Sequence, residues 1–213
     1  LIAIWMAVWW AAHFVLWPLW TGGRAVRCAA TPLEHYRMRL CRSQAYCVCA
    51  ILGGARLLLD CRWDPDDLLY KLSFEHQVFF TMAVAHWLVS IWEDQMCAHF
   101  LPAGMEHDIL GALTVQSMRA TFLQAYMSHH VVAAAAFAGV LAHRACVGLA
   151  SFGLVFELPV LLMNHREFAV CAEPRPAWFR NPRRLKRFWR DLHFLFVIGR
   201  VGPTLVYAHS LIF

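Results

Sequence analysis

The chain has 213 residues, of which 60% are hydrophobic and 15% are charged. A soluble domain is usually nearer half apolar and about a quarter charged, so this composition excludes a large soluble module and predicts one integral membrane domain over residues 1–213. The net charge of +5 is concentrated in short segments, which favours loops that flank a membrane over binding to nucleic acid.

Apolar segments recur along the chain, and each is long enough to cross a bilayer, which takes about 20 mostly apolar residues. They predict an all-α bundle of six spans, or seven if residues 104–122 also cross. The six are Leu1–Trp20, Met38–Leu59, Leu72–His99, Leu123–Ala142, Ala145–Asn164 and Phe188–Phe213. Residues 104–122 are alternatively an interfacial helix or the first turns of the fourth span. Pro159 and Pro203 each remove a backbone donor from an apolar run, which predicts a kink there.

Charges between the predicted spans indicate an orientation. Thr21–Arg42 carries five arginines and one glutamate, and His165–Arg190 carries seven arginines and one lysine against two glutamates. Asp60–Lys71 is acidic instead, with four aspartates against one arginine and one lysine. With six spans the two basic segments lie on one side, which the positive-inside rule makes cytosolic. Both ends of the chain are then expected on the opposite side.

Ionisable side chains within the predicted spans are candidate functional residues, because a charge inside a bilayer is costly. His129 and His130 head the apolar run Val131–Leu141. Neighbours on a helix point about 100° apart, so both rings can line one cavity but are poorly placed to chelate one metal. An imidazole can act as a general base or as a nucleophile. The alternative interpretation is an interfacial histidine pair at a helix end.

Acidic and basic groups on other predicted spans are possible partners of these histidines. Glu93 and Asp94 close the third span, where they either orient a histidine or reach the headgroup region. Glu157 lies in mid-span, which favours a pairing or cavity-lining role. Arg200 is too deep to extend easily to the surface, so Glu157 or Asp94 is its expected partner, in a functional site or in an ion pair that sets helix register.

Five motifs follow one another from Tyr36 to the end of the chain. They are Tyr36, Arg39 and Ser43; Asp94 closing an aromatic-rich span; the adjacent His129 and His130; Glu157, Pro159, Asn164 and Arg166; and Arg200 ahead of Pro203. In this order they resemble the TLC-domain family, which includes ceramide synthases, TRAM proteins and smaller TLC-domain proteins. The resemblance covers residues 36–213. Tyr46 departs from it by standing where the family usually has a histidine.

The resemblance implies a six-helix barrel around a lipid cavity and acyl transfer from acyl-CoA to a sphingoid amine. His129 or His130 would activate the amine or accept the acyl group, and Asp94 would orient the histidine. The residues expected at the substrate or cavity are Glu157, Asn164, Arg166, Arg200, Tyr46 and Ser43. Asn164 and Arg166 are alternatively markers of the membrane interface.

The resemblance also sets expectations for ligands, partners and location. It implies acyl-CoA as co-substrate, with its phosphates held by the basic loops, and no bound cofactor or metal. Expected partners are membrane lipids, a sphingoid base and a second copy of the chain, with no nucleic acid. The endoplasmic reticulum is the expected location, and the plasma membrane is the alternative.

The sequence also bears on functions other than acyl transfer. Val147–Phe156 holds no acid where ceramide synthases carry an acidic segment, and the pattern after Glu157 is nearer the smaller TLC-domain proteins. A non-catalytic protein of lipid binding, homeostasis or trafficking is therefore the alternative. A di-iron desaturase needs clusters such as His-x-x-x-His, and none occurs. A channel or transporter lacks the expected inverted repeat.

Overall fold

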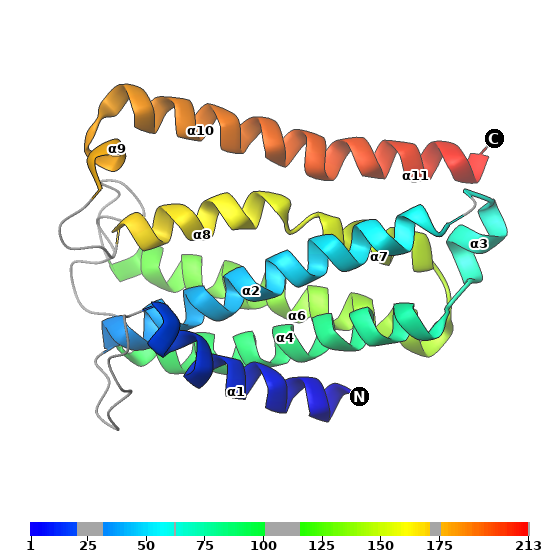
Figure 1. The fold of residues 1–213 in the computed structure, drawn as a ribbon, viewed down its shortest axis with the longest axis horizontal. Helices are drawn as coiled ribbons and strands as arrows, with labels where there is room; N and C mark the ends of the chain where they lie inside the picture. Colours follow the sequence, from blue (N-terminus) through cyan, green and yellow to red (C-terminus); the bar gives the residue numbers. More distant parts are fainter. Residues whose placement is uncertain (21–31, 62, 101–115, 171–175, 213) are drawn as a thin grey trace.

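The computed structural model describes residues 1–20, 32–61, 63–100, 116–170 and 176–212. Every regular element within these ranges is helical, which confirms the predicted all-α fold. The elements are α1 (Ile2–Trp20), α2 (Pro32–Leu59), α3 (Pro65–Tyr70), α4 (Phe74–Phe100), α6 (Gln116–His143), α7 (Val147–Val155), α8 (Leu158–Val170), α9 (Ala177–Arg180), α10 (Pro182–Phe196), the π-helix η1 (Val197–Val201) and α11 (Gly202–Ile212). Figure 1 shows the long helices side by side, with the C-terminus near α3 and with α9 at the opposite end.

Each predicted span coincides with helix, although only some of these helices are continuous. The first four spans correspond to α1, α2, α4 and α6, and α2 alone has 28 residues, a length of about 42 Å. The fifth corresponds to α7 followed by α8, and the sixth to the end of α10, η1 and α11. Of residues 104–122, the possible seventh span, residues 116–122 form the first turns of α6. Residues 104–115 lie outside the described residues.

The described helices differ in the length of their apolar stretches. One stretch, Val147–Ala169, is long and apolar enough to cross a membrane, with a mean hydropathy of 1.7. Shorter apolar stretches are Ile2–Ala12 and Met127–His143.

Two helices begin with matching caps. The Asp64 carboxylate accepts a hydrogen bond from the Asp66 backbone nitrogen at 3.4 Å, directly before α3. Before α10, the Asn181 side chain accepts from the backbone nitrogen of Arg183 at 3.0 Å. In both cases the next residue is proline, whose fixed φ suits the first helical position. These signals set the residues at which α3 and α10 begin.

Two helices are interrupted next to each other. The break between α7 and α8 spans Phe156 and Glu157 and precedes Pro159, while η1 precedes Pro203. Proline removes a backbone donor, and a π-turn often marks such an interruption. A Cβ placed on Gly199 of η1 would lie 3.6 Å from Cδ of Pro159, so the two irregular segments are in contact. The interruptions expected at both prolines are therefore present.

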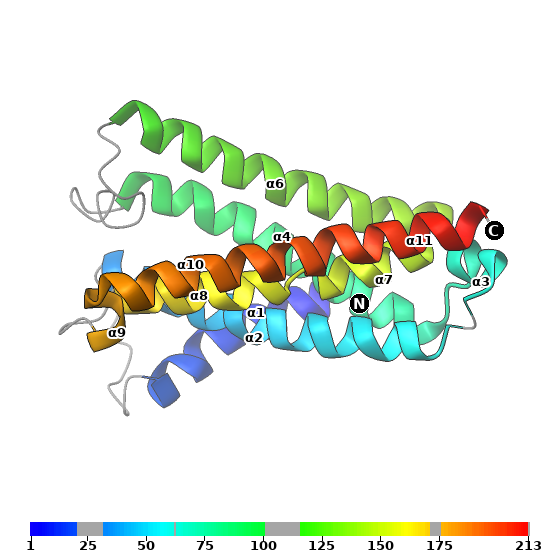
Figure 2. The same cartoon turned by 90° about the horizontal axis from the view of Figure 1, so that it is seen from above.

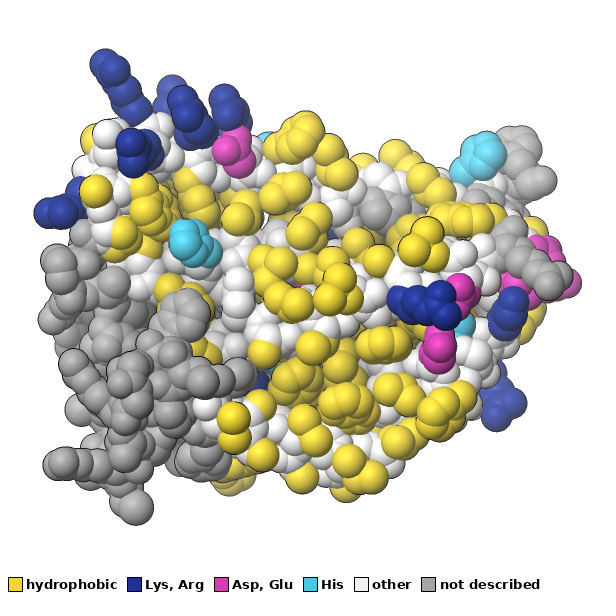
Figure 3. Space-filling view, in the orientation of Figure 1, with side chains coloured by type: hydrophobic (Ala, Val, Ile, Leu, Met, Phe, Trp, Pro, Cys, Tyr) yellow, Lys and Arg dark blue, Asp and Glu magenta, His cyan; other side chains and the backbone are white. Residues whose placement is uncertain are grey.

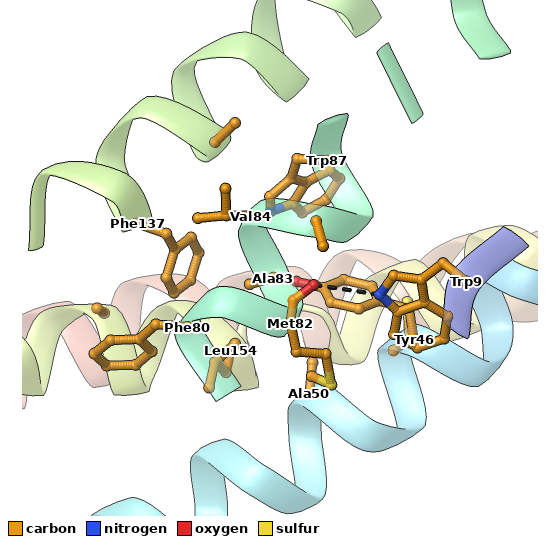
Figure 4. Packing of buried hydrophobic residues seen from close by; sticks show 14 of the residues in the cluster. Trp9, Tyr46, Ala50, Phe80, Met82, Ala83, Val84, Trp87, Phe137 and Leu154 are labelled. Atoms are coloured by element: carbon orange, nitrogen blue, oxygen red, sulfur yellow. Dashed lines mark hydrogen bonds between the residues drawn. The ribbon is translucent and has the colours of Figure 1, made fainter. Parts of the chain in front are cut away.

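The core lies where α4 packs against α1, α2 and α6. Figure 2 shows α4 and α6 running alongside each other, with α10 and α11 on another face of the bundle. Phe80, Ala83 and Ala85 of α4 are wholly buried. The ring of Phe80 packs against that of Phe137 in α6, with the ring centroids 5.6 Å apart. Figure 4 shows Phe80 near Phe137 and Leu154, and Met82 near Ala50 and Tyr46 of α2. The core is therefore centred on α4.

The outer surface is apolar along the middle and charged towards the ends. Large hydrophobic side chains are exposed on several helices, among them Ile4, Leu52, Val132 and Leu205, each more than half accessible. Figure 3 shows hydrophobic side chains over the middle of one face, with lysine and arginine gathered over α10 and acidic groups around α3. The exposed cations of α10 are Arg183, Arg184, Lys186, Arg187 and Arg190.

Candidate functional site

The adjacent histidines His129 and His130 lie in α6 and contact one indole of α4. His130 is 5% exposed, and its ring stacks on Trp87 with centroids 5.0 Å apart. His129 is exposed and meets the same indole edge-on at 5.6 Å. The two imidazole centroids are 5.7 Å apart. Because neighbours on a helix diverge by about 100°, one ring faces the core and the other faces outward.

A second group of polar side chains joins α2 to α8. The Cys47 thiol donates to Oε2 of Glu157 across 3.7 Å, and Glu157 is only 7% exposed. Seven residues after Glu157, in α8, Nδ2 of Asn164 donates to the hydroxyl of Ser43 in α2 at 3.0 Å. Residues four apart on α2 and seven apart around α8 lie on one face of each helix. The structure therefore brings three predicted residues, Ser43, Glu157 and Asn164, into one seam.

Arg200 links this seam to the histidines. It lies in η1, and its positive charge acts on both Glu157 and His129. Its guanidinium also lies over the Phe196 ring, 4.6 Å from the ring centroid. An electrostatic interaction between Arg200 and Glu157 was one of the two pairings expected from the sequence. The π-turn allows η1 to present this charge beside the break that presents Glu157.

Tyr46 lies between the seam and the histidines. It is 1% exposed, and its ring is parallel to His86 of α4, with centroids 3.6 Å apart and planes at 5°. It also meets Trp87 edge-on at 5.5 Å. The carboxylate of Glu157 acts electrostatically on the Tyr46 hydroxyl. Figure 4 shows Tyr46 next to Trp9 of α1, whose indole donates to the Met82 carbonyl at 3.3 Å.

A buried ion pair supports this aromatic group from one side. Nη1 of Arg42 is 2.6 Å from Oε1 of Glu93, and the Arg42 side chain is 1% exposed. Nη2 of Arg42 donates to Ser90 Oγ at 3.1 Å, and that hydroxyl lies 3.5 Å from Nε2 of His86. Arg39 adds a second, longer contact to Glu93 at 3.9 Å. Glu93 is thus part of a network between α2 and α4.

Two predicted residues fall outside this arrangement. Arg166 is 8% exposed, and its Nη1 donates a hydrogen bond to Oε1 of the neighbouring Glu167 at 2.6 Å. Its guanidinium carbon lies 5.2 Å from the centroid of the Trp189 ring in α10. Arg166 therefore ties α8 to α10. Asp94 is in α4, and its side chain lies outside the part of the molecule that the structure describes. Its proposed role next to a histidine stays a prediction.

The sequence interpretation missed His86 and Trp87 of α4. A signal for His86 was available, since His86, Ser90 and Glu93 stand at intervals of four and three in an otherwise apolar helix. That spacing places polar groups on one helical face. Trp87 carried no comparable signal, because a tryptophan in an apolar run is typical of packing. Only its contact with both histidines distinguishes it.

The chemistry available is that of imidazole, carboxylate, thiol and guanidinium groups in an apolar bundle. Within the described ranges, no three His, Cys, Asp or Glu side chains are placed to hold one metal ion. Comparison with known proteins returned no matching family model, no matching curated protein and no matching solved structure. The site is therefore interpreted from its geometry and from the motif resemblance.

Proposed function

We propose that the chain is a multi-pass membrane protein whose six helical passes cross the bilayer. Three features support this proposal: the predicted spans coincide with helices, large hydrophobic side chains are exposed along the middle, and charges gather at the ends (Figure 3). Buried Arg42, Glu157 and Arg166 would be expensive in hydrocarbon without partners, and each has a polar contact. The basic end would face the cytosol, with the endoplasmic reticulum as the proposed location and the plasma membrane as the alternative.

We further propose that this protein is an acyl-CoA-dependent lipid N-acyltransferase of the TLC type. The observation that carries the proposal is the histidine pair, with one ring buried against Trp87 and the other exposed, within electrostatic reach of Arg200. A buried imidazole beside an accessible one is suited to proton transfer at a lipid amine. The ordered TLC-like motifs add to this observation, and acyl-CoA and a long-chain sphingoid base are the proposed substrates.

In the proposed reaction, the neutral amine nitrogen attacks the thioester carbonyl carbon. A histidine of the pair accepts the amine proton as the C–N bond forms, and the carbonyl electron pair moves to oxygen. When that pair returns, the C–S bond breaks, and the coenzyme A thiolate takes the proton from the imidazolium. The products are an N-acyl lipid and free coenzyme A. Arg200 and Glu157 would balance charge near the imidazole during this transfer.

The test is coenzyme A release by the purified full-length chain supplied with acyl-CoA and a long-chain amine. Replacing His129 and His130 by alanine should lower the rate by at least about a hundredfold, the scale of general acid–base catalysis. His143→Ala is the matched control, because His143 is an exposed histidine at the end of the same helix, and its rate should equal that of wild type. Absence of release with every one of several amines would overturn the proposal.

The alternative is a non-catalytic protein of lipid homeostasis, and the acid-free segment Val147–Phe156 favours it. It predicts that cells expressing the His129, His130 double alanine variant keep the lipid composition of wild type. A lipid profile equal to that of the deletion would instead favour the enzyme. A second copy of the chain as a partner stays a proposal, to be tested by the mass of the detergent-purified particle.

A further inference from the structure

Three buried polar atoms have no hydrogen-bond partner among the described residues and belong to the aromatic group around Trp87, the indole that contacts both histidines. They are the Tyr46 hydroxyl oxygen, Nδ1 of His86 and Nε1 of Trp87. Their side chains are 1%, 2% and 5% exposed. Most buried polar groups in native proteins are paired, because an unpaired one loses its hydrogen bonds to water without replacing them. A cluster of such atoms therefore points to a group that binds there.

The three side chains belong to one aromatic array. Tyr46 stacks on His86 with ring centroids 3.6 Å apart, and Trp87 lies edge-on to Tyr46 at 5.5 Å and to His86 at 4.9 Å. The same indole stacks on His130 and meets the ring of His129. Because His129 contacts the Trp87 ring, a ligand that reaches the exposed His129 comes close to the side chain that carries the unpartnered indole nitrogen.

The chemistry of these atoms selects the kind of group that they would bind. An indole N–H can only donate a hydrogen bond, and a tyrosine hydroxyl can donate one as well as accept. The opposite ring nitrogen of His86 already faces the Ser90 hydroxyl at 3.5 Å. Two donors thus require an acceptor, and the acceptor common to acyl lipids is the carbonyl oxygen.

We propose that Trp87 Nε1–H and Tyr46 O–H bind the carbonyl oxygen of an acyl-lipid ligand beside His129 and His130. This inference rests on the proposed function and names the contact that would orient its acyl group. In the transfer reaction the same donors hold the oxygen as it gains the carbonyl electron pair, and they release it when the C–S bond breaks. Donors of this kind act most strongly in a site that excludes water.

A neighbouring tryptophan provides the matched control. Trp9 is also buried, at 4% exposed, and lies 5.9 Å from the Tyr46 ring, but its indole already donates to the Met82 carbonyl. Replacing Trp9 by phenylalanine removes an indole from the same region without removing an unpartnered donor. Tyr46→Phe is the cleaner of the two test variants, because it deletes one oxygen atom and leaves the ring stack with His86.

The probe is a long-chain ketone with a 13C-labelled carbonyl, compared with the alkane of equal length, on the full chain in lipid nanodiscs. The wild-type protein should bind the ketone more tightly than the alkane and lower its infrared carbonyl frequency. Tyr46→Phe and Trp87→Phe should each weaken ketone binding by up to about tenfold, the effect of one lost hydrogen bond, and should raise that frequency. Trp9→Phe should keep the wild-type preference and frequency.

The outcomes separate this inference from the proposed function. An unchanged carbonyl frequency in both Tyr46→Phe and Trp87→Phe, or no preference of the wild-type protein for ketone over alkane, overturns the inference even if coenzyme A is released. A frequency shift that depends on both residues supports it even if no coenzyme A is released with any amine, in which case the acyltransferase proposal alone is lost.

Discussion

Arg42 shows how burial changes the importance of an ion pair. Its side chain is 1% exposed and bonds to both Glu93 and Ser90, whereas the pair of Arg56 with Asp60 is about half exposed on both sides. Removing one partner of a buried pair leaves an uncompensated charge, while water screens an exposed pair. The two arginines lie on the same helix, so they can be compared directly.

We expect Arg42→Met to lower the free energy of unfolding by about 3–5 kcal/mol, because Glu93 is left without its closest cation. Arg56→Met should change it by at most about 1 kcal/mol. The measurement is denaturant unfolding of the purified protein in mixed micelles. Equal effects of the two substitutions would show that Glu93 is well solvated despite its contact with Arg42.

Residue spacing identified part of the site, and cross-helix contact identified the rest. His129, His130, Glu157 and Arg200 were predicted because ionisable residues in apolar runs are conspicuous. Cys47 was not, since a thiol in an apolar run is ordinary until its partner is known. The carboxylate of Glu157, more than a hundred residues away, gives it that partner.

At the scale of the elements, close approach of helices depends on individual glycines. A Cβ on Gly54 of α2 would lie 2.8 Å from both Cβ of Leu154 and the carbonyl oxygen of Ser151 in α7. Gly139 of α6 has no such neighbour, since nothing lies within 4 Å of the added atom. The close packing of α2 against α7 therefore depends on Gly54, whereas Gly139 allows no comparable approach.

Gly54→Val is expected to destabilise the protein by about 1–3 kcal/mol, because α2 and α7 must separate to admit the side chain. Gly139→Ala should instead stabilise it by about 0.5–1 kcal/mol through its better helix propensity. Thermal unfolding of both variants in the same detergent provides the comparison. A Gly54→Val protein as stable as wild type would mean that the α2–α7 contact is looser than the structure places it.

For the whole molecule, the arrangement of helices and charges makes a prediction about topology. The C-terminus and the acidic α3 lie at one end, and the basic α10 begins at the other (Figure 1). If all six passes cross the bilayer, these two ends lie on opposite sides of the membrane.

We expect a glycosylation acceptor inserted in the α3 region, next to Asp66, to be modified in endoplasmic reticulum membranes. The same insertion next to Ala177 in α9 should stay unmodified, because that end is expected to face the cytosol. Gel mobility with and without glycosidase measures both. Modification at α9 and not at α3 would reverse the proposed orientation, and modification at both positions would contradict the proposed six passes.

The amino-acid sequence by itself determined the helical class, the places where helices run and the unequal distribution of charge, because these depend on local composition and on period. It also predicted the interruptions at Pro159 and Pro203, since a missing donor acts on its own helix. Only the tertiary structure decided which polar groups meet, such as Glu157 with Cys47 and Trp87 with both histidines. Those contacts depend on the register and rotation of helices that are distant in the chain, which side-chain packing sets and local sequence does not specify.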